Sequence, residues 1–590
     1  MKKLSDILEQ RISQAIETVT GQEDCPALVG GSKSAKFGDY QANGVMAAAK
    51  KIKTNPRQLA EQIVAELDID DICQPPEIAG PGFINLRLKD EFVAGRLLEI
   101  NSDKDRLGIE KVKMPKTVVV DYSGPNIAKQ MHVGHLRSTI IGDCISRMVE
   151  FEGHTVVRQN HIGDWGTQFG MLCTLLEEKV HKASKDEGLL NISQTLEDLE
   201  KFYQEAKLKD DTDEEFAKEA RAAIAGLHHG EEYWLNSWKD IVRESRNHYQ
   251  PIYGRLAVKL TPEDERGESF YADKLADVVE QLEAKKLATK SDGAVCVFPG
   301  DFKNKDGDPL PFIIQKSDGA FLYATTDLAA LRFRINELKA DKIIYVTDAR
   351  QALHFNMLFE TAKMAGWTDN IDLTHVTFGT MLGTDGKPFK TRTGGTVKLK
   401  DLLDEAVQRA TAVVEEKNPD LPEEQKKEIA QAVGIGAVKY ADYSNNRNSD
   451  FVFSFDKMLA MEGNTAPYMQ YAYARIKSIE RKTESKVDIE NELAGIDSLT
   501  FSDEAEKELG KMLIRYDQAI AVAAEECRPN YLTGYLYDLA QTFSRFYNAC
   551  PVLKAEADQR VIRLLLCDLT ARTIKHGLTE LLGIEVVEQM

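Results

Sequence analysis

The sequence contains no apolar run that approaches the roughly 20 residues of a membrane-spanning helix. Its start, Met1-Lys2-Lys3, leads into an amphipathic helical pattern and does not resemble a signal peptide. We therefore expect a cytoplasmic protein that has no membrane partner.

Cysteine is scarce and dispersed. The eight cysteines stand singly, and no Cys-x-x-Cys pair is present, so we expect no structural zinc and no redox site. Cys144 lies close to a histidine-rich loop and has the chemistry of a nucleophile. A small, packed core residue is the commoner role for such a cysteine, and we favour it.

Net positive charge is also lacking, since 75 Lys and Arg residues face 95 Asp and Glu residues, for a net charge of −20. This balance excludes unspecific coating of nucleic acid, so any RNA contact must use local basic patches. A chain of 590 residues is too long for one hydrophobic core, and its 43% hydrophobic content is that of a folded protein. We expect three or four domains.

The first 112 residues have the pattern of a small α/β domain. Apolar residues recur at helical spacing from Leu4 to Ile12, and a second helix is expected from Pro56 to Leu67. Residues 82–86 form a short apolar run typical of a strand. The charged stretch from 101 to 115 has the composition of a linker.

A strand, loop, helix and strand follow within some forty residues. Residues 117–120 are a β-branched run that ends at Asp121, and the loop beyond it carries His132-Val133-Gly134-His135, called HVGH below. Apolar residues then recur at helical spacing until Gly153, a typical C-terminal cap, and residues 155–157 form the next strand. Such βαβ units build parallel sheets, and these bind ligands at the carboxyl ends of their strands. A later strand, 343–346, ends in polar residues that we expect at the same edge.

Helices dominate the remaining segments. Residues 174–259 are rich in charged helix formers, which predicts a helical insertion between the two halves of the sheet. Beyond Gly463 the apolar spacing is helical throughout, with breaks at Pro529 and Pro551, which is typical of an antiparallel bundle. Leu509, Leu513, Tyr516 and Ile520 form one such apolar row.

HVGH has the position and chemistry of a phosphate-binding loop. Two imidazoles and free backbone N–H groups are expected at the positive end of a helix dipole, which suits the phosphates of ATP, and Gly134 leaves room for the nucleotide. The alternative is that His132 and His135 only cap or pack the helix start. Two of only eleven histidines at this one site favour the nucleotide. No Walker-type loop competes, because residues 383–387 have the wrong glycine spacing.

A second loop combines glycines with cations. Residues 383–392 include Lys387, Lys390 and Arg392 in a segment that turn-forming residues make flexible, so it has the means to close over a triphosphate. Three cations are also common in a solvated surface loop, and that interpretation stays open without HVGH.

Several long segments resemble class I arginyl-tRNA synthetases of bacterial type. The resemblance covers nearly the whole chain and includes residues 121–135, 160–170, 386–392 and 462–471, with Gly38-Asp39-Tyr40-Gln41 and residues 80–85 near the start. The chain departs from the Lys-Met-Ser-Lys-Ser pattern common in class I, because it has Lys387-Pro388-Phe389-Lys390-Thr391 instead. Lys129, just before HVGH, is a candidate substitute for a displaced lysine.

The resemblance implies a multidomain α/β fold and an arginine–tRNA ligase. Its expected domains are an N-terminal α/β domain at the tRNA elbow (1–112), a Rossmann-like parallel-sheet catalytic domain (113–400) with an insertion at about 174–310, a connecting helical segment at the tRNA stem (401–455) and a C-terminal helical anticodon-binding domain (456–590). The expected reaction forms arginyl-adenylate from arginine and ATP, with Mg²⁺ assisting, and then transfers arginine to the 2′-hydroxyl of tRNA(Arg). Members commonly require bound tRNA for activation. A monomer is expected.

The resemblance also implies roles for individual residues. Pro125, His132, Gly134, His135, Lys387 and Lys390 would bind ATP, and all of these except Pro125, together with Lys129, would be catalytic. Tyr323, Asp327 and Gln351 would hold the guanidinium, while Asp121 and Asn126 would hold the α-amino end. A carboxylate and an aromatic neighbour suit a guanidinium, although a helix N-terminal charge and a core aromatic are the commoner fates of Asp327 and Tyr323.

In the bundle, five side chains are candidates for tRNA contact: Tyr468, Tyr471, Tyr473, Arg475 and Lys477. A tyrosine-rich core with solvated cations explains them equally well. Two other functions compete with the main one. A small-molecule ligase or nucleotidyltransferase would also use H-x-G-H, and a catalytically silent tRNA-binding paralogue would keep the bundle but lose the histidines.

Overall fold

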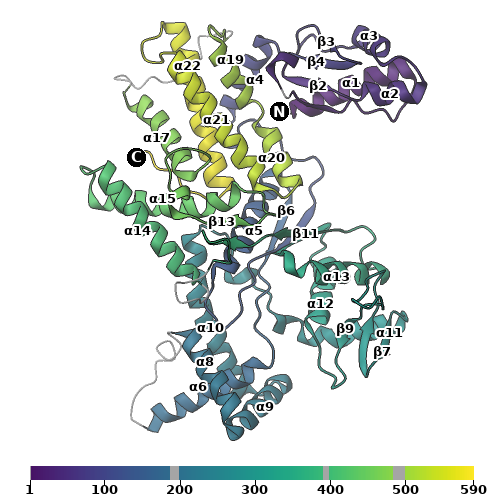
Figure 1. Ribbon diagram of the computed structural model, residues 1–590, viewed down its shortest axis with the longest axis vertical. Coiled ribbons are helices and arrows are strands. Elements are labelled where there is room, and N and C mark those ends of the chain that lie inside the picture. Colours follow the sequence, from purple (N-terminus) through teal and green to yellow (C-terminus); the bar gives the residue numbers. More distant parts are fainter. Residues whose placement is uncertain (1, 33, 186–197, 390–396, 483–498) are drawn as a thin grey trace.

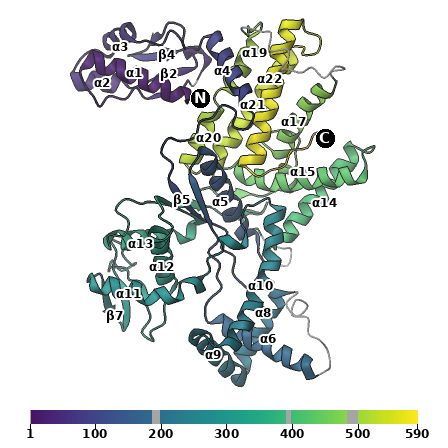
Figure 2. The same ribbon diagram turned by 180° about the vertical axis from the view of Figure 1, so that it is seen from behind.

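The computed structural model describes residues 2–32, 34–185, 198–389, 397–482 and 499–590. A small N-terminal unit projects beside a helical C-terminal bundle, and a group of insertion helices occupies the opposite end of the molecule (Figures 1 and 2). A parallel sheet lies between these ends. Within the described residues, the helices fall short of the length and apolarity needed to cross a membrane.

The N-terminal unit packs helices on a four-stranded antiparallel sheet of order β1-β2-β4-β3. Asn55 starts one of its helices by accepting two backbone N–H groups, and Pro56 follows at the first helical position, where its missing N–H costs nothing. The elements are α1 (Leu4–Thr20), β1 (Val29–Gly31), β2 (Tyr40–Ala42), α2 (Val45–Ile52), α3 (Pro56–Glu66), β3 (Glu77–Ala79), β4 (Phe83–Leu86) and α4 (Asp90–Ser102).

The catalytic sheet has the order β11-β10-β5-β6, and all of its neighbours run parallel. Its strands are β5 (Thr117–Asp121), β6 (Thr155–Gln159), β10 (Lys342–Asp348) and β11 (Asp372–Phe378). The strand order reverses between β5 and β10, the position where open parallel sheets bind ligands. The prediction that β5 and β10 end at the same edge is confirmed, because they are parallel neighbours.

Each strand of this sheet sends alternate side chains into two separate cores. Val118 and Val120 of β5 belong to a large core shared with the bundle, whereas Val119 belongs to a second core. In β10, Ile344 faces the first core and Ile343 the second. Helices therefore cover both faces, as expected for a Rossmann-like sheet.

The helix after HVGH is α5 (Val133–Glu152), and Gly153 ends it with φ 103°, so the predicted C-terminal cap is confirmed. Every residue from Leu136 to Val149 is buried, because α5 packs against the sheet on one side and against the bundle on the other. Cys144 is fully buried there, and burial raises the pKa of its thiol, so its interpretation as a core residue is confirmed. The other seven cysteines are likewise buried and free.

The insertion consists of two parts. The first is helical: α6 (Gln168–Lys185), α8 (Leu199–Thr212), α9 (Glu214–His229) and α10 (Glu232–Arg255). The second is α11 (Leu275–Ala284) with a small antiparallel sheet of β7 (Ala288–Ser291), β8 (Ala294–Val297) and β9 (Phe312–Gln315). The catalytic domain then continues with α12 (Tyr323–Asn336), which packs on α11 and β9, and with α13 (Ala352–Met364) after β10. The predicted helices of residues 174–259 are confirmed where the structure describes them, whereas the strands β7 and β8 were not predicted, because they are short and half-polar and periodicity does not reveal them.

The chain then passes into the bundle. The connecting elements are β12 (Met381–Leu382), α14 (Leu399–Lys417), α15 (Glu423–Tyr443), β13 (Phe451–Val452) and α16 (Phe455–Met458). The bundle consists of α17 (Ala466–Lys482), α19 (Glu504–Leu513), α20 (Tyr516–Glu525), α21 (Pro529–Ala549), α22 (Ala557–Lys575) and a final π-helical turn, His576–Leu581. The apolar row from Leu509 to Ile520 is divided between α19 and α20, so it does not belong to one helix.

Candidate active site

His132 and His135 form a reciprocal cap at the start of α5. The Nδ1 atom of His132 accepts the N–H of Gly134 at 3.0 Å, and the Nδ1 atom of His135 accepts the N–H of His132 at 3.1 Å. The two ring centroids are 4.0 Å apart. The alternative that these histidines cap the helix therefore holds, but it leaves one nitrogen of each ring unused by the cap.

Burial and neighbouring groups determine the charge of both rings, and the cap determines which nitrogen carries the proton. Burial lowers the pKa of His132, and the charge of Lys129 lowers it further. Burial and His132 lower the pKa of His135 to about 3. Both rings are therefore neutral at pH 7, and because each Nδ1 accepts a hydrogen bond, each Nε2 carries the proton. The pair offers two neutral N–H donors to a phosphate and no positive charge.

The expectation of free backbone N–H groups at HVGH is wrong for all four residues, since the N–H of His132 already donates to the ring of His135. The N–H of Val133 donates to the carbonyl of Val397 at 3.1 Å, that of Gly134 to the ring of His132, and that of His135 to the carbonyl of His132 at 2.9 Å. The capping rings and the returning chain satisfy these donors, a detail that local sequence does not show.

Gly134 makes room first for a protein ring. A Cβ atom at this position would lie 2.7 Å from Cε1 and 2.9 Å from Nδ1 of His132. Any side chain at position 134 would therefore displace the cap. Space for the nucleotide, the reason predicted from the sequence for this glycine, stays a prediction.

The predicted lysines lie in different surroundings. Lys129 is exposed, and its Nζ lies 4.6 Å from the ring of Tyr203 on α8. Lys387 is exposed in a hairpin whose Gly383 N–H donates to the carbonyl of Lys387 at 2.7 Å. Lys390 and Arg392 lie outside the described residues. Val397, which follows the lysine loop, lies beside HVGH and accepts the N–H of Val133. This hydrogen bond connects the C-terminal end of the loop to the start of α5.

The predicted guanidinium ligands lie at the start of α12 and α13. Tyr323 is the first residue of α12, and 70% of its side chain is exposed, so the alternative of a core aromatic is wrong. Asp327 follows one turn later, after the first turn of α12. Its Oδ2 lies 2.6 Å from Nε2 of His354, and its Oδ1 lies 3.9 Å from Nε2 of His161. Gln351 is exposed just before α13.

His161 connects this group to the nucleotide loop. It belongs to the loop after β6, in which Gly163 bridges Asn126 and lies close to that side chain. The Nδ1 atom of His161 is buried and has no hydrogen-bond partner among the described residues. The loop before HVGH, the loop after β6 and the start of α12 are thus in continuous contact, and the proposed adenylate and arginine residues share one edge of the sheet.

Asp121 is already paired with a protein guanidinium. Arg334 of α12 is fully buried, and its Nη2 donates to Oδ2 of Asp121 at 2.7 Å while its Nε donates to Gln159 at 2.6 Å. Arg334 therefore holds the ends of β5 and β6 together. The sequence prediction missed it, because a buried arginine within a helix resembles any surface cation.

Glu268 is a second residue that the prediction missed. It is half-buried near two other carboxylates, and burial, Asp164 and Asp327 raise its pKa to about 8. Its backbone N–H donates to the carbonyl of Ile162, which places it beside the His161 loop. A carboxyl group held neutral next to Asp327 indicates a site that accepts a cation. Its only sequence signal is its position in the run Glu265-Arg266-Gly267-Glu268.

The bundle candidates are split between surface and core. Tyr471 is 40% exposed, whereas Tyr473 is 3% exposed, so the alternative of a core tyrosine holds for Tyr473. Arg475 lies over the ring of Tyr547 at 4.5 Å, and Tyr468 contacts Tyr537 with ring centroids 5.7 Å apart. Lys477 forms an interaction of its own within the protein.

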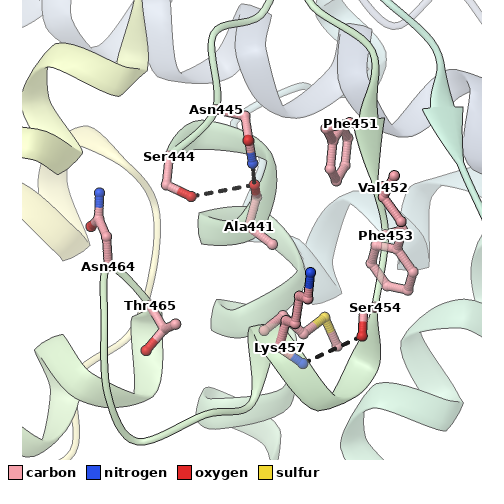
Figure 3. A pocket seen from close by; sticks show the side chains of 11 residues that line it. Ala441, Ser444, Asn445, Phe451, Val452, Phe453, Ser454, Lys457, Asn464 and Thr465 are labelled. Carbon is pink, nitrogen blue, oxygen red and sulfur yellow. Dashed lines mark hydrogen bonds between the residues drawn. The ribbon is translucent and has the colours of Figure 1, made fainter. Parts of the chain in front are cut away.

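A cavity of about 380 Å³ lies away from HVGH, between α15, β13, α16 and the start of α17. Figure 3 shows Phe451, Val452 and Phe453 along one wall and Asn464 and Thr465 on the other. Lys457 is the cation among the lining residues, and no carboxylate lines the cavity. The described residues form no cluster of three or more His, Cys, Asp or Glu side chains arranged to hold a metal ion.

Three family models match the chain in order. An arginyl tRNA synthetase N terminal domain matches residues 6–88, a catalytic domain of tRNA synthetases class I (R) matches residues 97–455, and a DALR anticodon binding domain matches residues 469–590.

Whole proteins match over their full length. Arginine–tRNA ligases of Cellvibrio japonicus and Laribacter hongkongensis are 51% and 50% identical to the chain, and each match covers 100% of both sequences. The crystal structure of arginyl-tRNA synthetase from Plasmodium falciparum superposes with a TM-score of 0.83 at 30% identity, and that from Thermus thermophilus with a TM-score of 0.80 at 25% identity, each covering 100% of both chains.

Proposed function

The chain belongs to the class I arginyl-tRNA synthetase family, and we propose that it performs the family reaction at the shared edge of β5 and β10. It is an arginine–tRNA ligase, which activates arginine with ATP and attaches it to tRNA(Arg). The observation that carries the proposed site is the reciprocal cap of His132 and His135, which leaves two Nε2–H donors at the switch point of the sheet.

In the proposed first step, the carboxylate of arginine attacks the α-phosphorus of ATP, and pyrophosphate leaves. The attacking carboxylate is ionised at pH 7, so this step needs no general base. The two Nε2–H groups donate to phosphate oxygens, and their fixed orientation lets them act without reorganisation. Because both rings are neutral, the positive charge that balances the leaving pyrophosphate comes from the lysine loop, with Lys387 and Lys390 as candidates and Lys129 as the nearer alternative.

In the proposed arginine pocket, Asp327 and Tyr323 face the guanidinium with Gln351, while Asp121 and Asn126 hold the α-amino end. The contact between Asp327 and His354 supports this proposal, since it fixes the orientation of the Asp327 carboxylate on α12. We add Glu268 on the guanidinium side, because a carboxyl group of raised pKa beside Asp327 becomes charged when a cation arrives. Removing one partner of a buried charge is costly, so a pocket of this kind selects strongly against amino acids that lack the guanidinium.

Mg²⁺ enters this proposal as part of the nucleotide substrate. Magnesium is usually bound by one or two carboxylates together with substrate phosphates, and it keeps several of its waters. Pro125, in the loop beneath HVGH, would border the nucleotide.

For the second step, we propose that the 2′-hydroxyl of the terminal adenosine attacks the adenylate and takes the arginine. The N-terminal unit (1–112) would contact the tRNA elbow, the insertion the acceptor stem, residues 401–455 the tRNA stem, and the bundle (456–590) the anticodon. Exposed Tyr471 is the best stacking candidate of the bundle, with Tyr468 and Arg475 beside it. We further propose a cytoplasmic monomer.

An aminoacylation assay with all twenty amino acids and total tRNA tests the substrate assignment. Arginine alone should be esterified, and pyrophosphate should be released in equal amount. Pyrophosphate exchange with and without tRNA then tests the expected tRNA requirement. Charging of a second amino acid at a comparable rate would contradict the proposed pocket.

A further inference from the structure

We propose that Arg137 and Asp442 form a positioning pair that fixes the lysine hairpin, residues 381–389, relative to the HVGH histidines. The inference rests on the function proposed above for Lys387. It concerns two residues that lie outside the substrate pockets and act through backbone groups of the hairpin and its neighbours.

Arg137 joins three parts of the protein through one side chain. It lies on α5, two residues after His135, and its side chain is 2% exposed. Its Nε donates to Oδ2 of Asp442 on α15 at 2.7 Å. Its Nη1 donates to the carbonyl of Gly379 at 2.7 Å, and its Nη2 to the carbonyl of Arg447 at 3.3 Å. Gly379 stands where the chain leaves β11 for the lysine hairpin, so Arg137 ties the start of that hairpin to the HVGH helix.

The hairpin is mounted on residues 451–453, called the mounting strand below. Met381 and Leu382 pair with Phe451 and Val452, and the N–H of Phe453 donates to the carbonyl of Leu382 at 2.8 Å. The rings of Phe389 and Phe453 lie 5.1 Å apart. Any shift of the mounting strand therefore moves both arms of the hairpin, and with them the backbone of Lys387.

The mounting strand has a cavity on one side and Arg137 on another. Its three residues line the cavity of about 380 Å³ (Figure 3), so packing on that face leaves space for displacement. The guanidinium of Arg137 lies 5.1 Å from the ring of Phe451. The ion pair thus supplies a restraint that the cavity side lacks.

The chemistry of the pair indicates that it positions other groups more than it stabilises the fold. Asp442 is 1% exposed, and its Oδ1 has no partner among the described residues. Burial raises the pKa of Asp442, and Arg137 opposes that shift. Replacing a buried ion pair by apolar residues is often neutral for stability, so stability alone does not account for it. Apolar residues would not reproduce the simultaneous hydrogen bonds that Arg137 donates to Gly379, Arg447 and Asp442.

The first test separates the two half-reactions in the full-length enzyme. The double variant R137M/D442N removes both charges at nearly constant volume. With saturating tRNA, we expect adenylate formation in a single turnover to slow by roughly 10- to 100-fold, the size of effect that a misplaced catalytic group produces. Transfer of arginine to tRNA from synthetic arginyl-adenylate should change less than about 3-fold, since the lysines serve the departing pyrophosphate. Equal slowing of both half-reactions would overturn the proposal.

A matched control comes from the bundle. Arg563 donates to Glu506 at 2.6 Å, with exposures of 10% and 0%. The variant R563M/E506Q should leave adenylate formation within about 3-fold of the parent, as expected for sites that share no partner. If R137M/D442N does not fold, the single change Arg137→Lys keeps the charge beside Asp442 but replaces the planar fork. It should show the same split between half-reactions, and a normal rate of adenylate formation would overturn the proposal.

A coupling measurement tells a failure of this inference from a failure of the proposed function. Lys387→Ala is made alone and together with R137M/D442N. If the pair acts through the hairpin, the combined loss is clearly smaller than the product of the separate losses. A loss equal to the product overturns the positioning role while Lys387 keeps its own. If Lys387→Ala leaves adenylate formation unchanged, the role proposed for the lysine is wrong, and the inference falls with it.

Discussion

The Nδ1 atom of His135 accepts the backbone N–H of His132 at 3.1 Å, so the second ring fixes the backbone that carries the first. Both Nδ1 atoms are used in this way, and both Nε2–H groups remain for a ligand. The pair therefore caps the helix through its Nδ1 atoms and turns its Nε2–H groups toward the proposed phosphate site.

Replacing His135 by alanine tests both roles. We expect His135→Ala to abolish detectable adenylate formation in a single turnover and to leave the dissociation constant for tRNA nearly unchanged. The lost cap should lower the free energy of unfolding by about 1 kcal/mol. Asn55→Ala, which removes the cap of α3, is the control: a similar loss of stability should leave adenylate formation intact. Normal activation by His135→Ala would refute the site.

Gly134→Ala should act through His132. The added Cβ would lie 2.7 Å from Cε1 of that ring, so the ring must move. We expect adenylate formation to slow by roughly 10- to 100-fold, because a donor displaced by about 1 Å loses its alignment. Gly534→Ala in α21 adds the same methyl group where no atom lies within 4 Å, and it should have little effect. An unchanged rate for Gly134→Ala would show that the position of the His132 ring does not matter.

Asp327→Ala should separate the two small substrates. Because we propose that its carboxylate binds the guanidinium, we expect the KM for arginine to rise by roughly 100-fold or more, the effect of losing a charged partner, with a far smaller change for ATP. Asp277→Ala removes another carboxylate that contacts α12, through Arg332, and serves as the control in the same steady-state assay. Equal effects of Asp327→Ala on both KM values would remove this residue from the pocket.

Arginine binding should depend on pH through Glu268, whose pKa is raised to about 8 by burial, Asp164 and Asp327. Below that value the free protein holds a proton that the guanidinium expels. The affinity for arginine should therefore rise by up to about tenfold per pH unit and level off above about pH 8. Titration calorimetry in buffers of different ionisation enthalpy measures the released proton.

The same shift affects stability with a definite sign. The folded pKa lies above the ordinary value of 4.5, so the contribution of Glu268 to stability is present in full below that value and is lost as pH rises toward 8. Arginine should offset this loss, and its effect on the melting temperature should be larger at the alkaline end of that range. Glu268→Gln should abolish both pH effects; a variant that keeps the slope would assign the proton to another group.

Local sequence signals predicted the nucleotide-binding half of the fold. β5, α5 and β6 follow from a β-branched run, a helical apolar spacing and Gly153, all of which act within a few residues. The switch point follows from chain order and the geometry of parallel sheets. Residues 288–315 were missed, because their short strands gain their apolar face only when packed on α11 and α12.

Side-chain pairing across the chain could not be predicted in the same way. Asp121 meets Arg334, and Arg137 meets Asp442, across long separations that no local spacing encodes. The break between α19 and α20 also lacks a Gly or Pro signal, since Ile514 and Arg515 form it. Family resemblance supplied the candidate residues, whereas the tautomers of the histidines and the raised pKa of Glu268 required coordinates.

The catalytic sheet is assembled from two parallel βαβ halves that are distant in the chain, because the first half ends with β6 at Gln159 and the second begins with β10 at Lys342. Its central pairing, β5 with β10, closes a very long loop, and such contacts form late and slowly. During synthesis on the ribosome, the first half must wait for the whole insertion to emerge before its ligand-binding edge exists. Each newly synthesised molecule therefore becomes catalytically competent only late in its folding.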